Sequence, residues 1–266
     1  MDITWLISFL ALGSFVGFTA GLLGIGGGGI LVPILTFIFL RMGVTTNNVM
    51  HIALGTSMAC IIITSLSSLL AHNKKGTVQW QTVKSMAVGV VLGSFIAAQI
   101  ASYLNTLYLA IVFSAFMAWT ALKMLSRKSH AIPTTALKNT NMFYPAFSIG
   151  GLSALVSIGG GSLIVPYLTN RNVDIKTAIG TSAAIGFPIS VAGAIGYTLN
   201  TIETNGTMDH QVGFIYLPAV ILVSLASFLF APLGASISHR LPTKALKTIF
   251  ACLLIILSLK MLSILL

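Results

Sequence analysis

The chain has 266 residues, of which 56% are apolar and only 7% are charged. A soluble domain carries about 25% charged residues, so this composition cannot cover a water-facing surface. It excludes a soluble globular enzyme, a disordered chain and a nucleic-acid-binding domain. The 14 Lys and Arg residues that give the net charge of +10 are spread over gaps between apolar runs, as in the loops of a membrane protein.

The uncharged runs predict the elements in chain order. A helix needs about 20 residues to cross the apolar core of a bilayer. Six runs fit one crossing each: 50–70, 85–104, 106–122, 177–199, 212–238 and 248–266, the last of which has the charged Lys260 near its end. The stretches 3–40 and 139–170 do not fit, and we predict that each is a helical hairpin that bends inside the membrane.

Both of these long stretches are interrupted by glycines, at 26–29 and at 159–161, and a proline follows each run. Irregular backbone at membrane depth is stable only where protein buries it or where it lines a wet cavity. The alternative is that these glycines only allow close helix packing. We expect packing alone at Gly13, Gly17 and Gly21, which are spaced four residues apart.

The two halves of the chain are similar to each other. Residues 25–33 match residues 158–166 at six of nine positions, and the Gly-Thr-Ser block at 55–57 lies over a second one at 180–182. Such similarity predicts a duplication. The predicted units are a first repeat over 1–125, a cytoplasmic linker over 126–142 and a second repeat over 143–266.

Loop charges predict how the repeats are oriented. The loop at Lys74 and Lys75 is basic, whereas its equivalent at 200–211 has Glu203 and Asp209 and no Lys or Arg. By the positive-inside rule these loops lie on opposite sides of the membrane, so the repeats are inverted and both termini are outside. The predicted fold is an all-α polytopic membrane protein of two inverted-topology repeats, each a Gly-interrupted helical hairpin plus three transmembrane helices.

The paired motifs also resemble a known family. The duplicated Gly-Gly-Gly followed by Val-Pro, the two Gly-Thr-Ser blocks and the overall size are similar to the sulfite exporter TauE/SafE family of bacterial membrane permeases. The resemblance covers essentially the whole chain. It implies a transporter of the cytoplasmic membrane that exports or takes up sulfite, organosulfonates such as sulfoacetate, or other small oxyanions.

Inverted repeats with interrupted helices place their substrate near the midplane, where half-helix N-termini point N–H groups at it. The glycines would let the backbone approach an anion, and the Thr and Ser residues would donate hydroxyl hydrogen bonds. The predicted substrate-binding residues are Gly26, Gly27, Gly28, Gly29, Gly55, Thr56, Ser57, Gly159, Gly160, Gly161, Ser162, Gly180, Thr181 and Ser182.

Two further pairs align across the halves, His51 with Lys176 and Asn47 with Asn172. His51 and Lys176 either attract the anion at two mouths and couple transport to protons, or are a hydrogen-bonded interior histidine and a snorkelling lysine. Asn47 and Asn172 are either entrance ligands or turn residues.

Other functions have less support. The four acidic residues lie at chain ends or in loops, which disfavours a cation substrate. The glycine pattern at 24–29 lacks the strand and the acidic residue of a dinucleotide site. We expect no enzyme activity, metal, cofactor or nucleic-acid partner; the expected partners are a small anion and the lipid bilayer, with a homo-oligomer left open. An anion channel and a non-transporting membrane scaffold or assembly factor are the alternatives to a carrier that works by alternating access.

Overall fold

The computed structural model describes residues 2–23, 27–126, 142–200, 209–238 and 243–265, and helices account for most of them. A pair of two-residue strands, β1 (Gln211–Val212) and β2 (Ile215–Tyr216), precedes α9. The helices are α1 (Ile3–Leu23), α2 (Gly28–Arg41), α3 (Thr46–Lys74), α4 (Trp80–Tyr103), α5 (Thr106–Ser126), α6 (Phe143–Leu155), α7 (Gly161–Thr169), α8 (Ile175–Thr198), α9 (Leu217–Ser238) and α10 (Thr243–Leu265).

Six of the described helices are long and apolar enough to cross a membrane: α1, α3, α4, α5, α8 and α9. The predicted all-α polytopic membrane protein is therefore confirmed. The predicted interruptions also lie between helices, with α1 and α2 on either side of the first and α6 and α7 on either side of the second. The arms are unequal, because α1 has 21 residues whereas α6 has 13 and α7 only 9.

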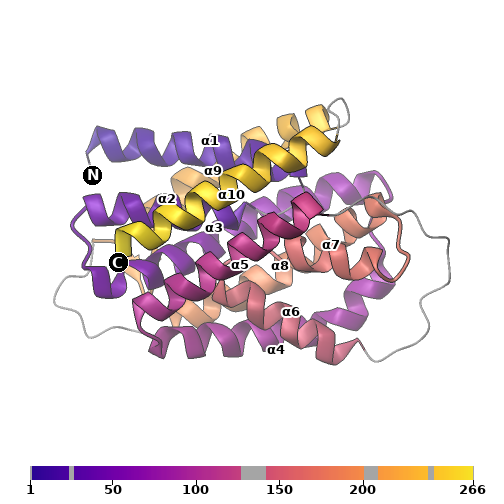
Figure 1. Cartoon of the computed structure of the whole chain (residues 1–266), viewed down its shortest axis with the longest axis horizontal. Coiled ribbons are helices and arrows are strands. Elements are labelled where there is room, and N and C mark those ends of the chain that lie inside the picture. The colour runs from indigo at the N-terminus through magenta and orange to yellow at the C-terminus, as the bar shows by residue number, and fades with distance from the viewer. Residues whose placement is uncertain (1, 24–26, 127–141, 201–208, 239–242, 266) are drawn as a thin grey trace.

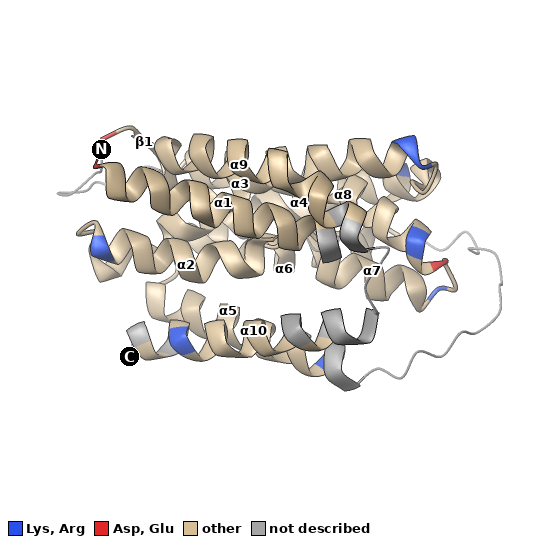
Figure 2. Ribbon diagram, turned by 90° about the horizontal axis from the view of Figure 1, so that it is seen from above, with Lys and Arg blue, Asp and Glu red and all other residues tan. Residues whose placement is uncertain are grey.

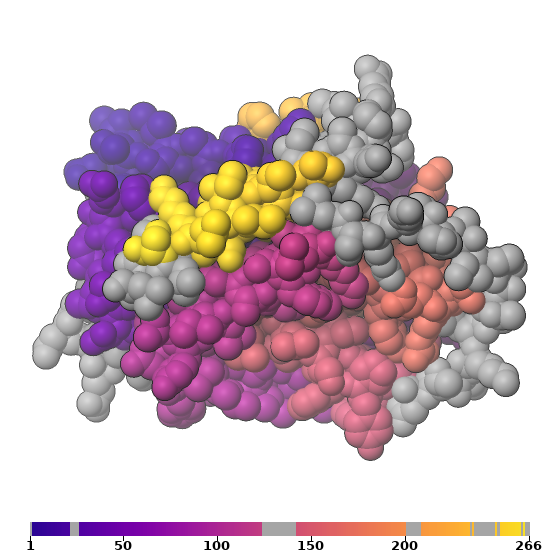
Figure 3. All heavy atoms as spheres, viewed as in Figure 1, coloured from indigo at the N-terminus to yellow at the C-terminus, as the bar shows by residue number. Residues whose placement is uncertain are grey.

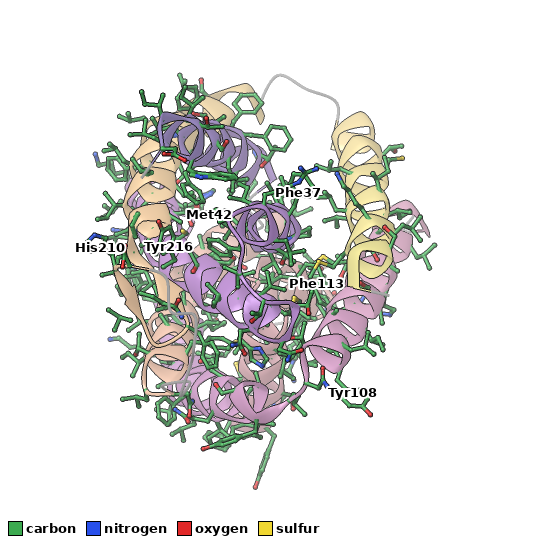
Figure 4. All side chains as sticks on the ribbon, turned by 90° about the vertical axis from the view of Figure 1, so that its left-hand side faces the viewer. Phe37, Met42, Tyr108, Phe113, His210 and Tyr216 are labelled. Atoms are coloured by element: carbon green, nitrogen blue, oxygen red, sulfur yellow. The ribbon has the colours of Figure 1, made fainter. Side chains whose placement is uncertain are left out.

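One predicted span begins too early. The apolar run 212–238 predicts a single helix, but its first residues form an antiparallel hairpin in which Gln211 pairs with Tyr216. Gly213 has a φ of +56° in the turn, which glycine adopts without the steric cost of a Cβ. At one end of the molecule (Figure 4) the ring of Tyr216 packs against Phe9 of α1 and Phe39 of α2.

The helices form a bundle around α3 and α8. In their most apolar windows, 78% of the residues of α3 and 72% of those of α8 are buried, more than in the other candidate spans. The α1–α9 pair lies along one edge of the bundle and the α4–α6 pair along the other (Figure 1). Helices α5 and α10 pack on each other as a separate outer pair (Figure 2), and α10 lies alongside α5 on the face seen in Figure 3.

Several equivalent helix pairs of the two halves make equivalent contacts. If α1–α5 are matched with α6–α10, the α1–α9 pair corresponds to α6–α4, and the α3–α9 contact corresponds to α8–α4. Glycines allow both edge pairs to pack closely. Gly13 and Gly17 of α1 face the backbone of Val223 and Ser227 with no room for a Cβ, which confirms their predicted packing role.

The helix connections place the charges at two ends of the bundle. We call the end that holds the first residue of α1 and the last residue of α10 the terminal end, and the other the basic end (Figure 2). The basic end holds Lys74, Lys75, Lys84, Lys123, Arg171, Lys176 and Asp174, whereas the terminal end holds Asp2, Arg41, Asp209 and Lys260. Glu203 and nearly all of the predicted linker 126–142 lie outside the described residues.

Candidate functional site

The glycine interruptions give α2 and α7 the same unusual start. Gly27 and Gly160 are the N-cap residues of these helices, with φ of 72° and 78°, and neither helix has a side-chain cap. The left-handed backbone there is readily accessible only to glycine. The Ile30 and Leu163 N–H groups donate to the carbonyls of the cap glycines at 3.1 Å. Because nothing caps the helices from a side chain, the N–H groups of the two residues before each of these are available to another acceptor. Residues 27–29 and 159–161 are buried, and Gly26 lies outside the described residues.

The register of α3 against α8 locates the centre of the bundle. Gly193 of α8 faces Met58 of α3, and Gly186 faces Ser65, so the two helices run antiparallel with a constant offset. At that offset Ile63 and its repeat equivalent Pro188 lie at the same level. This level is the centre of the helix pair, and distances along the axis follow from the rise of about 1.5 Å per residue.

Both interruptions reach this centre. The backbone of Gly28 lies against the carbonyl of Ser157, which leaves no room for a Cβ, and close to the side chain of Ile61. In the other half, the carbonyl of Gly159 lies against Gly186. Ile61 and Gly186 are each two residues, or about 3 Å, from the central level. The structure therefore brings the two predicted glycine clusters together.

The Gly-Thr part of each Gly-Thr-Ser block holds a loop of the other half. The Thr56 hydroxyl accepts a hydrogen bond from the Tyr216 N–H at 3.0 Å, and the Thr181 hydroxyl accepts one from the Gln79 N–H at 3.0 Å. These N–H groups lie directly before α9 and α4. Positions 55 and 180 are occupied by glycine because a Cβ there would lie only 2.5 and 2.7 Å from carbonyl oxygens of the same loops.

The serines of the two blocks are different. Ser57 and Ser182 are fully buried, and among the described residues neither hydroxyl has a hydrogen-bond partner. Ser57 is one helical turn from Ile61, and Ser182 is one turn from Gly186, so each lies on the stripe of its helix that faces a glycine interruption.

These serines do not lie at the same level. Each is six residues from the central level, Ser57 toward the terminal end and Ser182 toward the basic end, so they are about 18 Å apart along the helix axes. The predicted set of residues therefore divides into a central glycine region and two flanking Gly-Thr-Ser blocks. The cause is the antiparallel packing of α3 and α8, which places equivalent residues on opposite sides of the centre.

Three residues beside the glycine interruptions are absent from the set predicted from sequence. Ser157 has a φ of +46°, and its hydroxyl donates to the Leu54 carbonyl at 3.0 Å. Met117 of α5 and Leu254 of α10 lie 3.1 and 3.2 Å from a Cβ placed on Gly29 and so cover the first interruption. Ser157 lies two residues before the predicted second glycine run. Met117 and Leu254 are apolar residues in apolar spans, and no sequence pattern distinguishes them from their neighbours.

His51 and Asn47 lie at the terminal end. His51 is buried; its Nε2 donates to the Leu104 carbonyl at 2.9 Å, and its ring stacks on Phe214 at 5.0 Å between centroids. Asn47 is exposed, and its backbone carbonyl accepts from the Thr106 hydroxyl. His51 therefore has the hydrogen-bonded interior position of the second alternative.

Lys176 and Asn172 lie at the basic end. Lys176 is exposed, and its backbone N–H donates to Asp174, which caps α8. Asn172 has a φ of +63° in the turn before that helix, so it is a turn residue. The two members of each aligned pair thus lie at opposite ends of the bundle, and none of the four residues reaches the central glycine region.

Comparison with known proteins gives a consistent result. Residues 9–261 match the family model described as sulfite exporter TauE/SafE. A "probable membrane transporter protein" of Haemophilus influenzae is 36% identical, with 97% of this chain and 98% of that protein covered. Similar proteins with the same description occur in Methanocaldococcus jannaschii, at 28% identity over 95% of this chain and 94% of the relative, and in Bacillus subtilis, at 29% over 94% of each. No solved structure matches the chain.

Proposed function

The chain belongs to the sulfite exporter TauE/SafE family, and we propose that it is a secondary transporter that exports small sulfur-containing anions such as sulfite or organosulfonates. Membership and the names of the relatives make it a membrane transporter rather than an enzyme. Its apolar helices make it a multi-pass protein of the bacterial inner-membrane type. The substrate and the mechanism are what the proposal adds.

The observation that carries the proposal is the pair of uncapped helix N-termini near the centre of the bundle. A helix N-terminus is equivalent to about half a positive charge and presents free N–H donors, the combination that binds oxyanions. α2 and α7 both begin there with buried glycines, so the backbone itself can approach the ligand.

The surrounding side chains fit an anion that must also be released. Among the described residues, the buried polar side chains are those of serines, threonines, tyrosines and His51. None of them is a carboxylate. Hydroxyl groups can donate to sulfite oxygens without the full charge of Lys or Arg. Such a site holds an anion less firmly than an arginine clamp does, as a carrier requires.

Alternating access is the mechanism we propose. The repeats predicted to be inverted make equivalent contacts around the α3–α8 pair, with α1–α9 matching α6–α4. In such a protein the two halves can exchange conformations, which opens the central region to one side and then to the other. In this mechanism the substrate binds at the glycine interruptions, which lie in the central region where the two halves meet.

A counterflow experiment tests the function. Purified protein is reconstituted in liposomes loaded with unlabelled sulfite under anaerobic conditions, and dilute 35S-sulfite is added outside. A carrier accumulates label transiently above equilibrium, whereas a channel only equilibrates it. Sulfate, thiosulfate, sulfoacetate, taurine and acetate are then tested as competitors. The proposal predicts counterflow with competition by sulfur-containing anions; label that only equilibrates, or no protein-dependent uptake of any anion in the panel, contradicts it.

A further inference from the structure

We propose that Arg41 and Lys260 form an anion-binding mouth, where the seam between α2 and α10 reaches the terminal end of the bundle. The substrate anion passes this mouth on its way between the first glycine interruption and the water beyond the terminal end. The inference rests on the proposed function. It adds a second binding place, the residues that make it and the route that connects it with the centre.

Two cations from different helices meet on one aromatic ring. The guanidinium carbon of Arg41, the last residue of α2, lies 5.3 Å from the centroid of the Phe37 ring, and the ammonium nitrogen of Lys260 in α10 lies 4.8 Å from it. The negative face of an aromatic ring attracts a cation. Figure 4, seen from the terminal end, shows Phe37 on the side of α2 that faces α10. All three residues are exposed, so an ion in the water can reach both charges.

No acidic residue balances this pair of charges. Among the described residues, neither Arg41 nor Lys260 forms an ion pair with a carboxylate. Two like charges held close together repel each other, and an anion beside both of them relieves that repulsion. The positive-inside rule does not account for the pair, because most of the described Lys and Arg residues lie at the opposite, basic end. An oxyanion suits the pair, since guanidinium and ammonium groups both donate to its oxygens.

Lys260 is placed differently from its equivalent in the first half. That equivalent is Lys123, because a Lys-Met pair occurs at 123–124 and again at 260–261. The Lys123 ammonium lies 4.3 Å from the ring centroid of Trp119, one turn earlier in its own helix. The Lys260 ammonium instead lies over a ring of another helix, α2. A lysine that only snorkels needs no ring on a neighbouring helix, so Lys260 contributes its charge to the seam.

The seam leads from this mouth to the first glycine interruption. Leu254 of α10 lies against Gly29 at the start of α2, and Lys260 lies against Phe37 near its end, so the two helices run side by side in the same direction. Phe37 is eight residues, or about 12 Å, from Gly29. At the inner end of the seam, side chains of Leu254 and Met117 cover Gly29. These are flexible side chains rather than backbone, so the cover can open through rotamer changes.

Sided transport measurements test the mouth. Half-saturation concentrations for 35S-sulfite are measured from each face, in right-side-out and inverted membrane vesicles that contain the full chain. From the terminal end, Arg41→Gln and Lys260→Gln should each raise the value about two- to fivefold, and the double variant about tenfold. From the basic end the change should stay below about twofold. Lys84→Gln, which removes an exposed cation at the basic end, is the matched control and should leave the terminal-end value unchanged.

Two further measurements identify the role of charge and the source of the anion. Arg41→Lys keeps the charge and should stay within about twofold of the wild-type value, and raising the ionic strength from about 20 to about 200 mM should weaken terminal-end uptake more in the wild type than in the double variant. In liposomes of phosphatidylcholine alone, the purified double variant should still differ from the wild type. A difference that appears only when phosphatidylglycerol is present would assign the two cations to a lipid phosphate and overturn the mouth.

The remaining outcomes separate the mouth from the proposed function. Unchanged terminal-end values in the double variant, or equal increases from both faces, would overturn the mouth while leaving the carrier function intact. A wild type without protein-dependent uptake of any anion of the panel would overturn the proposed function itself, and the mouth with it.

Discussion

Replacing Gly27 or Gly160 with alanine tests whether the interruptions need the left-handed backbone that the structure gives them. Both residues have φ above 70°. Placing an L-residue in that conformation costs about 1–2 kcal/mol. At Gly27 the added Cβ would also lie 2.5 Å from a methyl of Val16, and at Gly160 it would lie 2.6 Å from the end of the Ile164 side chain. Those flexible neighbours can move, at a typical overpacking cost of about 1–3 kcal/mol.

The expected loss of stability is therefore about 2–5 kcal/mol for each variant, similar in the two halves. At about 2–4 °C per kcal/mol for a chain of this size, Tm should fall by roughly 4–20 °C. Tryptophan fluorescence during heating of the detergent-solubilised protein measures it. Gly151→Ala is the control, because its Cβ would meet nothing closer than 3.5 Å, in the middle of α6; it should leave Tm unchanged or slightly raised.

Counterflow measurements on the same two variants test whether the substrate binds at the backbone of Gly27 and Gly160. Both alanine variants should lose counterflow at temperatures where they are still folded, because the helix start that presents the N–H groups is distorted. A Tm within about 2 °C of the wild-type value in either variant would refute the strain argument. Full counterflow in a variant whose Tm has fallen as expected would show that the substrate binds elsewhere.

Three further predictions concern the Gly-Thr-Ser blocks and the topology. Ser57→Ala and Ser182→Ala should raise the free energy of unfolding by up to about 1 kcal/mol, because each removes an unpaired buried hydroxyl; a clear loss in chemical or thermal unfolding would mean that the hydroxyl has a partner within the fold. Thr56→Val and Thr181→Val should each lower it by about 1–3 kcal/mol, because a loop N–H loses its acceptor, and unequal losses would contradict the equivalence of the two loops. Alkaline phosphatase fused to either terminus should be active, since both termini are expected outside; an inactive fusion at one terminus would rule out the proposed topology.

The sequence was sufficient to predict the fold class and the places where it is interrupted. Apolar run lengths are a direct consequence of bilayer thickness, so spans such as α3 and α8 were located to within a few residues. The β1–β2 hairpin was not recognised, because Val212, Phe214, Ile215 and Tyr216 are as apolar as the helix that follows them. Hydropathy alone does not distinguish a buried hairpin from the first turn of a span.

The candidate site was harder to predict, because its geometry depends on contacts between distant parts of the chain. Thr56 resembles a ligand in the sequence, but its hydroxyl is bonded to Tyr216, 160 residues away. Ser57 and Ser182 occupy equivalent positions in the sequence, and only the antiparallel packing of α3 and α8 shows that they lie at different depths. Composition and motif spacing contain no information on that packing.

The most direct test of the central claim is to locate the anion in the protein. Crystals grown in a lipid phase can be soaked with selenite, an analogue of sulfite whose selenium gives an anomalous signal. The account predicts selenium at hydrogen-bond distance from the N–H groups at the start of α2 or α7, at the glycine interruptions. Selenium found only beside surface lysines and arginines, in protein shown to bind selenite in solution, would contradict it.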